Sequence, residues 1–329
     1  MNINRRNFVK TVAGSTLAMI APQTLTAKEK KMPLPIIDTH QHLWDLSKFT
    51  PPWLATAPDV ISSTHVTQNY LEATKGLNVV KAVYMEIDVA PKQHVAEAQH
   101  VIALSKSEDH PTVAAVISGR PNSAGFAAYI EQFKESPYIK GVRQVMHVPT
   151  APQGMCLEPQ YVKSAQLLGE LGMSMDLCMR PEELGDGAKL ASLCKGTRFI
   201  VDHCGNADPK AFLPDSKRDG EAPWHSVDAW KRGIEDLAKQ DNVVCKISGV
   251  IARVPKTGWK PEMLAPIVNH CLDSFGPDRV MFGGDWPVCK IGGSFAEWVN
   301  ALKQIVGNRS IEAQKKLFHD NAEKFYGIA

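Results

Sequence analysis

Two histidines early in the chain and one aspartate near its end are the residues whose types and spacing best suit chemistry. His40 and His42 occur in IIDTHQHLWD, and Asp285 occurs in RVMFGGDWPV. Side chains alternate along a strand, so Asp38, His40 and His42 would share one face. Two imidazoles at this spacing can bind one divalent metal ion, and Asp285 could be a further ligand or take a proton from water. Asp38 could orient the imidazoles or cap the strand end. The alternative is a set of hydrogen-bonded polar side chains at strand ends.

Other polar residues interrupt or end apolar runs. His203 ends RFIVDHC and could be a third metal ligand or polarise a carbonyl, whereas the preceding Asp202 should point the other way. Arg143 lies inside the apolar run GVRQVMH, where a charge is unfavourable unless it is paired. It could bind a substrate carboxylate or form a buried salt bridge. Lys246 in NVVCKISG has the same two options.

Three further features could belong to a ligand pocket. Glu86, which ends YMEID, could face a ligand or pair with Arg143. Asp176 is similarly ambiguous. Trp286, together with Trp44 and Trp53, could form the wall of a pocket or simply pack in the core.

Eight short apolar runs must position these side chains. Their starts are about 35 residues apart on average, which is the length of a strand–helix unit. The expected strands are Ile36–His42, Val79–Ile87, Thr112–Ser118, Gly141–His147, Met173–Met179, Phe199–His203, Val243–Ser248 and Val280–Asp285.

Amphipathic stretches that favour helices lie between most of these runs. They are Pro91–Lys106, Phe126–Phe133, Pro159–Leu171, Pro181–Leu193, Trp230–Ala238, Pro261–Phe275, Ser294–Val306 and Ile311–Tyr326. Eight such units predict an α/β fold, a (β/α)8 TIM barrel, with its active site at the carboxyl ends of the strands. An open doubly wound sheet would need a glycine-rich turn where DTHQH stands after the first strand.

The first 27 residues differ from the rest of the chain. Residues 1–27 have a basic start with Arg5-Arg6, a short apolar run and small residues up to Ala27, which is typical of a twin-arginine export signal. We therefore expect a periplasmic protein whose residues 35–329 form a single barrel domain. A basic helical arm on a cytoplasmic protein is the alternative.

Composition narrows the class of partner. The 329 residues include 37 basic and 35 acidic side chains, a net charge of +2, with no basic block in the body of the chain. A nucleic-acid surface is therefore not expected, and no apolar run is long enough for a membrane span in the mature form. The seven cysteines form no CxxC pair and are expected to be buried free thiols.

The segments IIDTHQHLWD, FIVDHCGN, NVVCKISGV and RVMFGGDWPV, in this order, resemble the amidohydrolase superfamily. The resemblance covers residues 35–328, and the most similar branch holds sugar lactonases and 2-pyrone-4,6-dicarboxylate lactonase. It implies a hydrolase barrel of the metal-dependent type in which His40 and His42 match the metal ligands of the first strand. His203 matches the histidine of the sixth strand, and Asp285 matches the general base.

Two departures from the superfamily pattern bear on the cofactor. The fifth run, MSMDLCM, has no histidine, and Arg143 is the only candidate where many members place a lysine that bridges two metal ions. We expect one divalent metal ion, such as zinc, or none.

The resulting hypothesis is a hydrolase that opens the lactone ring of a small molecule, a sugar acid or a carboxylated cyclic ester. Asp285 and His203 would be catalytic, and His40, His42 and Asp285 would hold any metal. Arg143, Lys246, Glu86 and Trp286 would contact the substrate. Amide or ester hydrolysis, non-oxidative decarboxylation, and an exported binding protein without catalysis are the alternatives.

Overall fold

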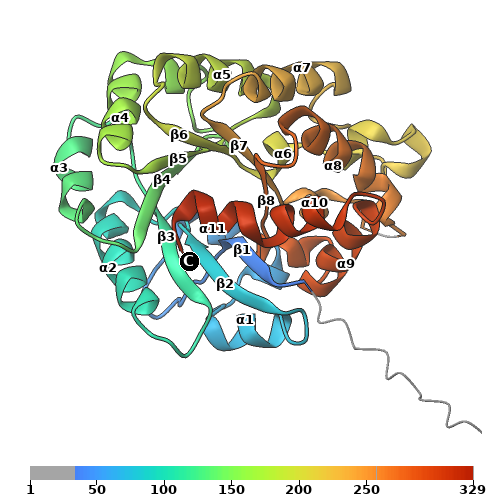
Figure 1. The fold of residues 1–329 in the computed structure, drawn as a ribbon, viewed down its shortest axis with the longest axis horizontal. Coiled ribbons are helices and arrows are strands. Elements are labelled where there is room, and N and C mark those ends of the chain that lie inside the picture. Colours follow the sequence, from blue (N-terminus) through green and yellow to red (C-terminus); the bar gives the residue numbers. More distant parts are fainter. Residues whose placement is uncertain (1–33, 257, 329) are drawn as a thin grey trace, which may run out of the picture. The chain divides into compact units, whose positions relative to one another are not determined.

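Eight parallel strands form one sheet in which the strands are ordered as they occur in the chain (Figure 1). The computed structural model describes residues 34–256 and 258–328; the predicted export signal, residues 1–27, lies outside them. The strands are β1 (Ile36–Gln41), β2 (Val79–Met85), β3 (Thr112–Ser118), β4 (Ile139–Val145), β5 (Ser174–Cys178), β6 (Arg198–Val201), β7 (Val243–Ile247) and β8 (Val280–Phe282).

The last strand returns to the first. A parallel bridge joins Gln41 to Trp286, and the Thr39 hydroxyl donates to the carbonyl oxygen of Phe282 at 2.6 Å. These contacts confirm the predicted barrel. Its strands are largely buried along their whole length, which explains their continuous apolar runs.

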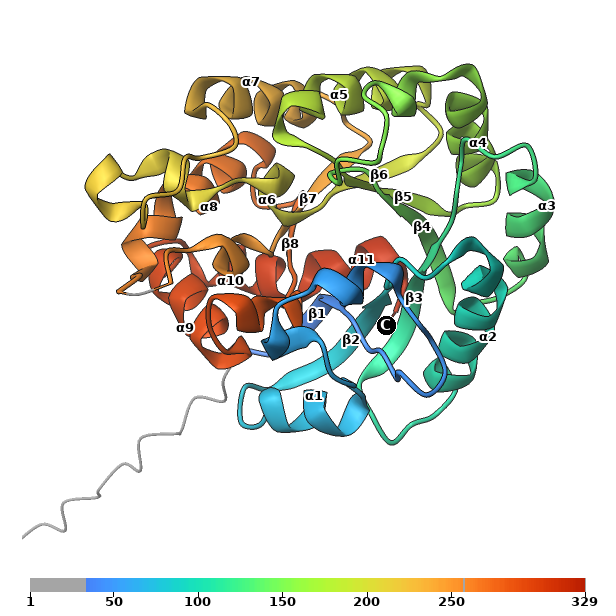
Figure 2. The same ribbon diagram turned by 180° about the vertical axis from the view of Figure 1, so that it is seen from behind.

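Helices surround the sheet in both views (Figures 1 and 2). They are α1 (Thr67–Ala73), α2 (His94–Ser105), α3 (Phe126–Ile130), α4 (Pro159–Glu170), α5 (Leu184–Leu193), α6 (His203–Asn206), α7 (Val227–Ala238), α8 (Pro261–Phe275), α9 (Phe295–Ile305), α10 (Ile311–Lys315) and α11 (Asn321–Tyr326). Local signals set several of their ends. Pro261 opens α8, and Ser294 and Glu297 form a reciprocal capping box at the start of α9.

The main differences from the expected elements are at strand ends. β6 ends at Val201 and β8 ends at Phe282, so His203 and Asp285 lie in the turns that follow. Both residues have left-handed backbone angles, with φ of 54° and 53°. The chain leaves the sheet early because each of these side chains must turn toward the barrel axis. Helix α1 was not expected from the sequence.

The chain's last helix closes one end of the barrel. Ala322, Tyr326 and Ile328 pack in one cluster with apolar residues of β1, β2, β3 and β8. The Lys81 ammonium donates to the carbonyl oxygen of Ile328 at 2.5 Å, and Arg198 donates to that of Phe325. Both basic residues lie near the amino ends of their strands, so the polar residues at the carboxyl ends face a separate opening.

The cysteines are as expected: all seven are buried and free. Within residues 34–256 and 258–328, no helix is both long enough and apolar enough to cross a bilayer.

Candidate active site

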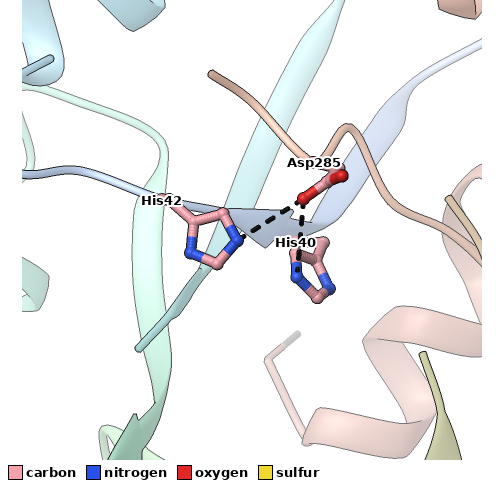
Figure 3. A group of neighbouring side chains, drawn as sticks. All are labelled: His40, His42 and Asp285. Atoms are coloured by element: carbon pink, nitrogen blue, oxygen red, sulfur yellow. Dashed lines mark ion pairs between the residues drawn. The ribbon is translucent and has the colours of Figure 1, made fainter. Parts of the chain in front are cut away.

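Asp285, His40 and His42 meet at the carboxyl ends of β1 and β8 (Figure 3). One carboxylate oxygen of Asp285, Oδ1, lies 3.5 Å from Nε2 of His42 and 3.8 Å from Nε2 of His40. Burial raises the pKa of Asp285, but His203, His42 and His40 outweigh it and hold the pKa below its usual range. Asp285 is therefore ionised at neutral pH and presents a negative charge to the two imidazoles.

The two imidazoles present their Nε2 atoms to the same point. Nδ1 of His42 lies 3.0 Å from the carbonyl oxygen of Met85, so a neutral His42 donates there and keeps its Nε2 lone pair free. Burial and the nearby His203 hold the pKa of His40 well below its usual range, so that ring is neutral. The Nε2 atoms of both rings thus lie close to the same carboxylate oxygen of Asp285.

The Asp38 carboxylate accepts hydrogen bonds from residues on both sides of the site. Its Oδ1 accepts hydrogen bonds from the backbone N–H groups of His40 at 3.0 Å and Gly284 at 2.7 Å, and its Oδ2 accepts one from the Tyr70 hydroxyl at 2.8 Å. Each oxygen is thereby occupied. Of the two roles considered for Asp38, the structure supports capping the strand end, with Tyr70 of α1 as a partner that the sequence did not reveal.

A chain of buried charges lies beside the histidines. Nε of Arg143 forms a 2.6 Å ion pair with Glu86, and Nη2 donates to the Glu86 carbonyl oxygen at 3.0 Å. Nη1 lies 3.1 Å from Nε2 of His40 and 3.4 Å from Asp202. Arg143 and Glu86 therefore form the buried salt bridge, and both also line the cavity described below, so their contact with a substrate stays a prediction.

The expected orientation of Asp202 is wrong. Its Oδ1 lies 3.6 Å from Nδ1 of His40, and the ring of His203 lies 4.4 Å from that of His40, so both residues face the barrel interior. Strict alternation fails because β6 has already ended and His203 adopts a positive φ. Nδ1 of His203 lies 3.0 Å from the Ser248 hydroxyl, which fixes the ring at the mouth of the barrel.

A cavity of about 390 Å³ opens in front of these residues. Its wall is formed by His42, Trp44, Trp53, Ile61, Glu86, Ile87, Asp88, Arg143, Val145, His147, Val148, Cys178, His203, Asn206, Gly249, Ala252, Arg253, Asp285, Val288 and Ile291. This volume suits a single small ring compound. Trp44 and Trp53 line the cavity as expected.

Two predicted substrate contacts are not placed to touch a ligand. Lys246 is fully buried, and its ammonium lies 2.6 Å from Asp176 and 3.4 Å from Asp202. Trp286 is also buried, and its ring packs edge-on against His65 and Tyr70. Neither residue belongs to the cavity wall. The structure instead shows the alternative that the sequence left open for each: a buried salt bridge for Lys246 and core packing for Trp286.

The cavity wall includes two basic residues that the sequence did not single out. His147 follows β4, and burial, with Arg253 nearby, lowers its pKa to about 3. Arg253 follows β7; its guanidinium stacks 3.7 Å from the centre of the Trp224 ring and donates to Asn206 at 3.1 Å. It forms no salt bridge with any residue in the described part of the chain. His147 could have been found as a polar residue just past a strand end, whereas Arg253 has no such signal.

The residues present fit one divalent metal ion. The ligand atoms of His40, His42 and Asp285 lie within 4.8 Å of one another, and two nitrogens with one carboxylate oxygen suit zinc. His40, Asp202 and His203 form a second group within the same distance, but Asp202 already neutralises Arg143 and Lys246. The first group is therefore the better candidate.

The comparisons with known proteins agree with this geometry. A family model described as amidohydrolase matches residues 37–328. The L-fucono-1,5-lactonase of Burkholderia multivorans is 23% identical over 300 residues, which cover 89% of this chain and 96% of that protein.

Two solved structures show the same fold. One is an amidohydrolase from Burkholderia multivorans with bound zinc; its TM-score is 0.76 at 19% identity, over 90% of this chain and 100% of that one. The other, from Acinetobacter baumannii, is named as a 2-pyrone-4,6-dicarboxylic acid hydrolase and has citric acid bound. Its TM-score is 0.67 at 17% identity, over 89% of this chain and 99% of that one.

The chain belongs to the amidohydrolase family. It is an enzyme, which sets aside the alternative of a binding protein without catalysis, and it acts on a small molecule.

Proposed function

We propose that this enzyme hydrolyses a lactone, with Asp285 as the general base. The observation that carries the proposal is the ionised Asp285 carboxylate, held beside the imidazoles of His40 and His42 at the edge of a cavity sized for one ring. Support also comes from the relatives named as lactonases of L-fuconate and L-rhamnonate.

The reaction follows from the positions of the side chains. Asp285 takes a proton from water while the water oxygen bonds to the lactone carbonyl carbon. His203, fixed by Ser248, and the Arg143 guanidinium lie where the developing oxyanion needs positive charge or a donated proton. The ring C–O bond then breaks, and the proton passes from Asp285 to the released oxygen, giving a hydroxy carboxylic acid. At neutral pH this acid releases its own proton to solvent. A divalent ion on His40, His42 and Asp285 would add Lewis-acid polarisation.

One residue of the cavity wall, Arg253, is suited to bind a negatively charged group of the substrate. In the cavity wall, Arg143 is already paired with Glu86. Lys246 does not belong to the wall. Arg253 contacts Trp224 and Asn206 and has no carboxylate partner among the salt bridges of residues 34–256 and 258–328, so it can bind a carboxylate on the lactone or on the opened product.

Decarboxylation is the second reaction to consider, and no residue favours it. In the resemblance drawn from the sequence, relatives with that activity usually hold a metal ion with a histidine of the fifth strand. β5 (SMDLC) has no histidine, and the carboxylate of its Asp176 is bound to Lys246.

The test is proton release at neutral pH from a panel of neutral sugar lactones and carboxylated lactones. The wild type is compared with Asp285→Asn and with Asp278→Asn, an exposed aspartate that serves as the matched control. We expect Asp285→Asn to lower kcat by about 10²–10⁴-fold and Asp278→Asn to leave it unchanged. A folded, metal-supplemented wild type that turns over no lactone would contradict the proposal, and carbon dioxide release from an aromatic acid would replace it.

The proposal places the enzyme in the periplasm, on the strength of the Arg5-Arg6 signal in residues 1–27. Cell fractionation tests it. The wild-type protein should appear in the periplasmic fraction, and Arg5→Lys/Arg6→Lys should keep it in the cytoplasm. Equal distribution of both proteins would refute export by this route.

A further inference from the structure

The Arg143 guanidinium contacts His40, one of the three residues of the candidate metal site. Its Nη1 lies 3.1 Å from Nε2 of His40, the same nitrogen that points toward Asp285 at 3.8 Å. That nitrogen has a single lone pair in a neutral ring. It can accept the Arg143 N–H or bind a metal ion, but it cannot do both.

The guanidinium is not free to move aside. Glu86 holds it at two points, through its carboxylate at 2.6 Å and its backbone carbonyl at 3.0 Å. Glu86 is itself fixed, because its other oxygen accepts hydrogen bonds from the Ser118 hydroxyl at 2.7 Å and from the backbone N–H of Asp88 at 2.6 Å. The whole assembly is buried, and a rotation of Arg143 would leave a charged carboxylate unpaired.

The positive charge of Arg143 also disfavours a metal ion at His40. A fixed positive charge in a buried site repels a second cation placed a few ångströms away. His42 and Asp285 have no such neighbour at their metal-facing atoms among the ion pairs of the described residues.

We propose that Arg143 is a built-in cation that competes with a divalent metal ion for Nε2 of His40. The native enzyme then binds such an ion weakly, through His42 and Asp285, and removal of the guanidinium creates a tighter site with three protein ligands. The inference concerns metal affinity and does not depend on which substrate is hydrolysed.

The test is calorimetric titration with Co²⁺ of protein freed of metal by dialysis. The wild type is compared with Arg143→Met/Glu86→Gln, in which both members of the ion pair lose their charge, while Asp202 keeps Lys246 at 3.4 Å. We expect the double variant to bind Co²⁺ at least tenfold more tightly, with the stronger visible absorption of a more fully protein-ligated ion.

His40→Asn in each background tells whether the gain comes through His40. It should change the wild-type affinity less than threefold and should remove at least tenfold from the double variant. Equal Co²⁺ affinity in wild type and double variant, or a wild type whose tight binding is lost with His40→Asn, would overturn the proposal. If circular dichroism shows that the double variant does not fold, the comparison of the wild type with the single variant His40→Asn tests the proposal by itself. Arg143→Lys, which keeps the charge without the planar donor fork, should remain near the wild type.

Discussion

The backbone N–H of Asp285 donates a 2.8 Å hydrogen bond to the carbonyl oxygen of His40. This bond joins the end of β1 to the turn after β8, residues that are far apart in the chain. The proposed base and the two imidazoles are therefore joined by adjacent backbone hydrogen bonds, this one and the 2.8 Å bond from the His42 N–H to the carbonyl oxygen of Trp286, and Asp38 reinforces them through Gly284. Small changes in this junction should alter catalysis before they alter the rest of the fold.

Gly249 tests how closely His203 is positioned. A Cβ at this position would lie 2.4 Å from Nδ1 of His203, and φ is +71°. We expect Gly249→Ala to displace the ring and lower kcat by about 10²-fold in the lactonase assay. Gly276→Ala is the matched control, because its φ is +70° and no atom lies within 4 Å of the added Cβ. Similar losses in both variants would mean that backbone strain, rather than the position of His203, is responsible.

Arg253 should set the preference for charged substrates. Replacing it by Met removes a charge-assisted contact, so KM for a carboxylated lactone should rise about 10- to 100-fold, while KM for a neutral lactone should change less than about threefold. Arg253→Lys should recover part of the loss. Steady-state kinetics on the two substrate types measure this. An equal rise for both would assign Arg253 to the shape of the pocket.

Lys246 should be a stabilising residue rather than a substrate contact. Lys246→Met leaves Asp176 and Asp202 buried without this cation, which should lower the free energy of unfolding by about 3–5 kcal/mol. Lys246→Met/Asp176→Asn should restore much of it. Urea denaturation measures both. A raised KM with unchanged stability would instead return Lys246 to the substrate-binding role expected from the sequence.

Glu97 should make stability depend on pH. It is fully buried, and burial together with the Glu86 carboxylate raises its pKa from 4.5 to about 7. Between these two values the folded chain keeps a proton that the unfolded chain has released, so stability falls as pH rises through this window. The loss is complete above pH 7 and amounts to at most about 3 kcal/mol.

Glu97→Gln should remove this dependence, because an amide can still accept the hydrogen bonds from the N–H of Ile87 and the hydroxyl of Tyr84. Denaturation at pH 5 and pH 8 should therefore show a larger benefit of the variant at pH 8. Glu312→Gln, at an exposed helix position, should show no such difference. If the variant raises the free energy of unfolding equally at both pH values, ionisation of Glu97 does not cause the pH dependence.

The barrel could be predicted from the sequence because its strands are buried on both faces and its helices are amphipathic. His40, His42 and Asp285 could be grouped because strand ends meet at one rim. The direction of the Asp202 side chain could not be predicted, because it depends on where β6 ends and on the positive φ of His203. The role of Arg253 depends on Trp224 and Asn206, which are distant in the chain, and no local pattern encodes that contact.

The burial of all seven cysteines has a consequence for how the enzyme must be produced. While the chain is unfolded, seven exposed thiols can form wrong disulfides under oxidising conditions. Once the barrel has closed, all seven are buried, and Cys178, which lines the cavity, stays protonated and unreactive because burial raises the pKa of its thiol to about 12. Oxidant should therefore trap the protein during refolding and leave the native enzyme untouched. A protein with this property tolerates an oxidising compartment only if it arrives there already folded.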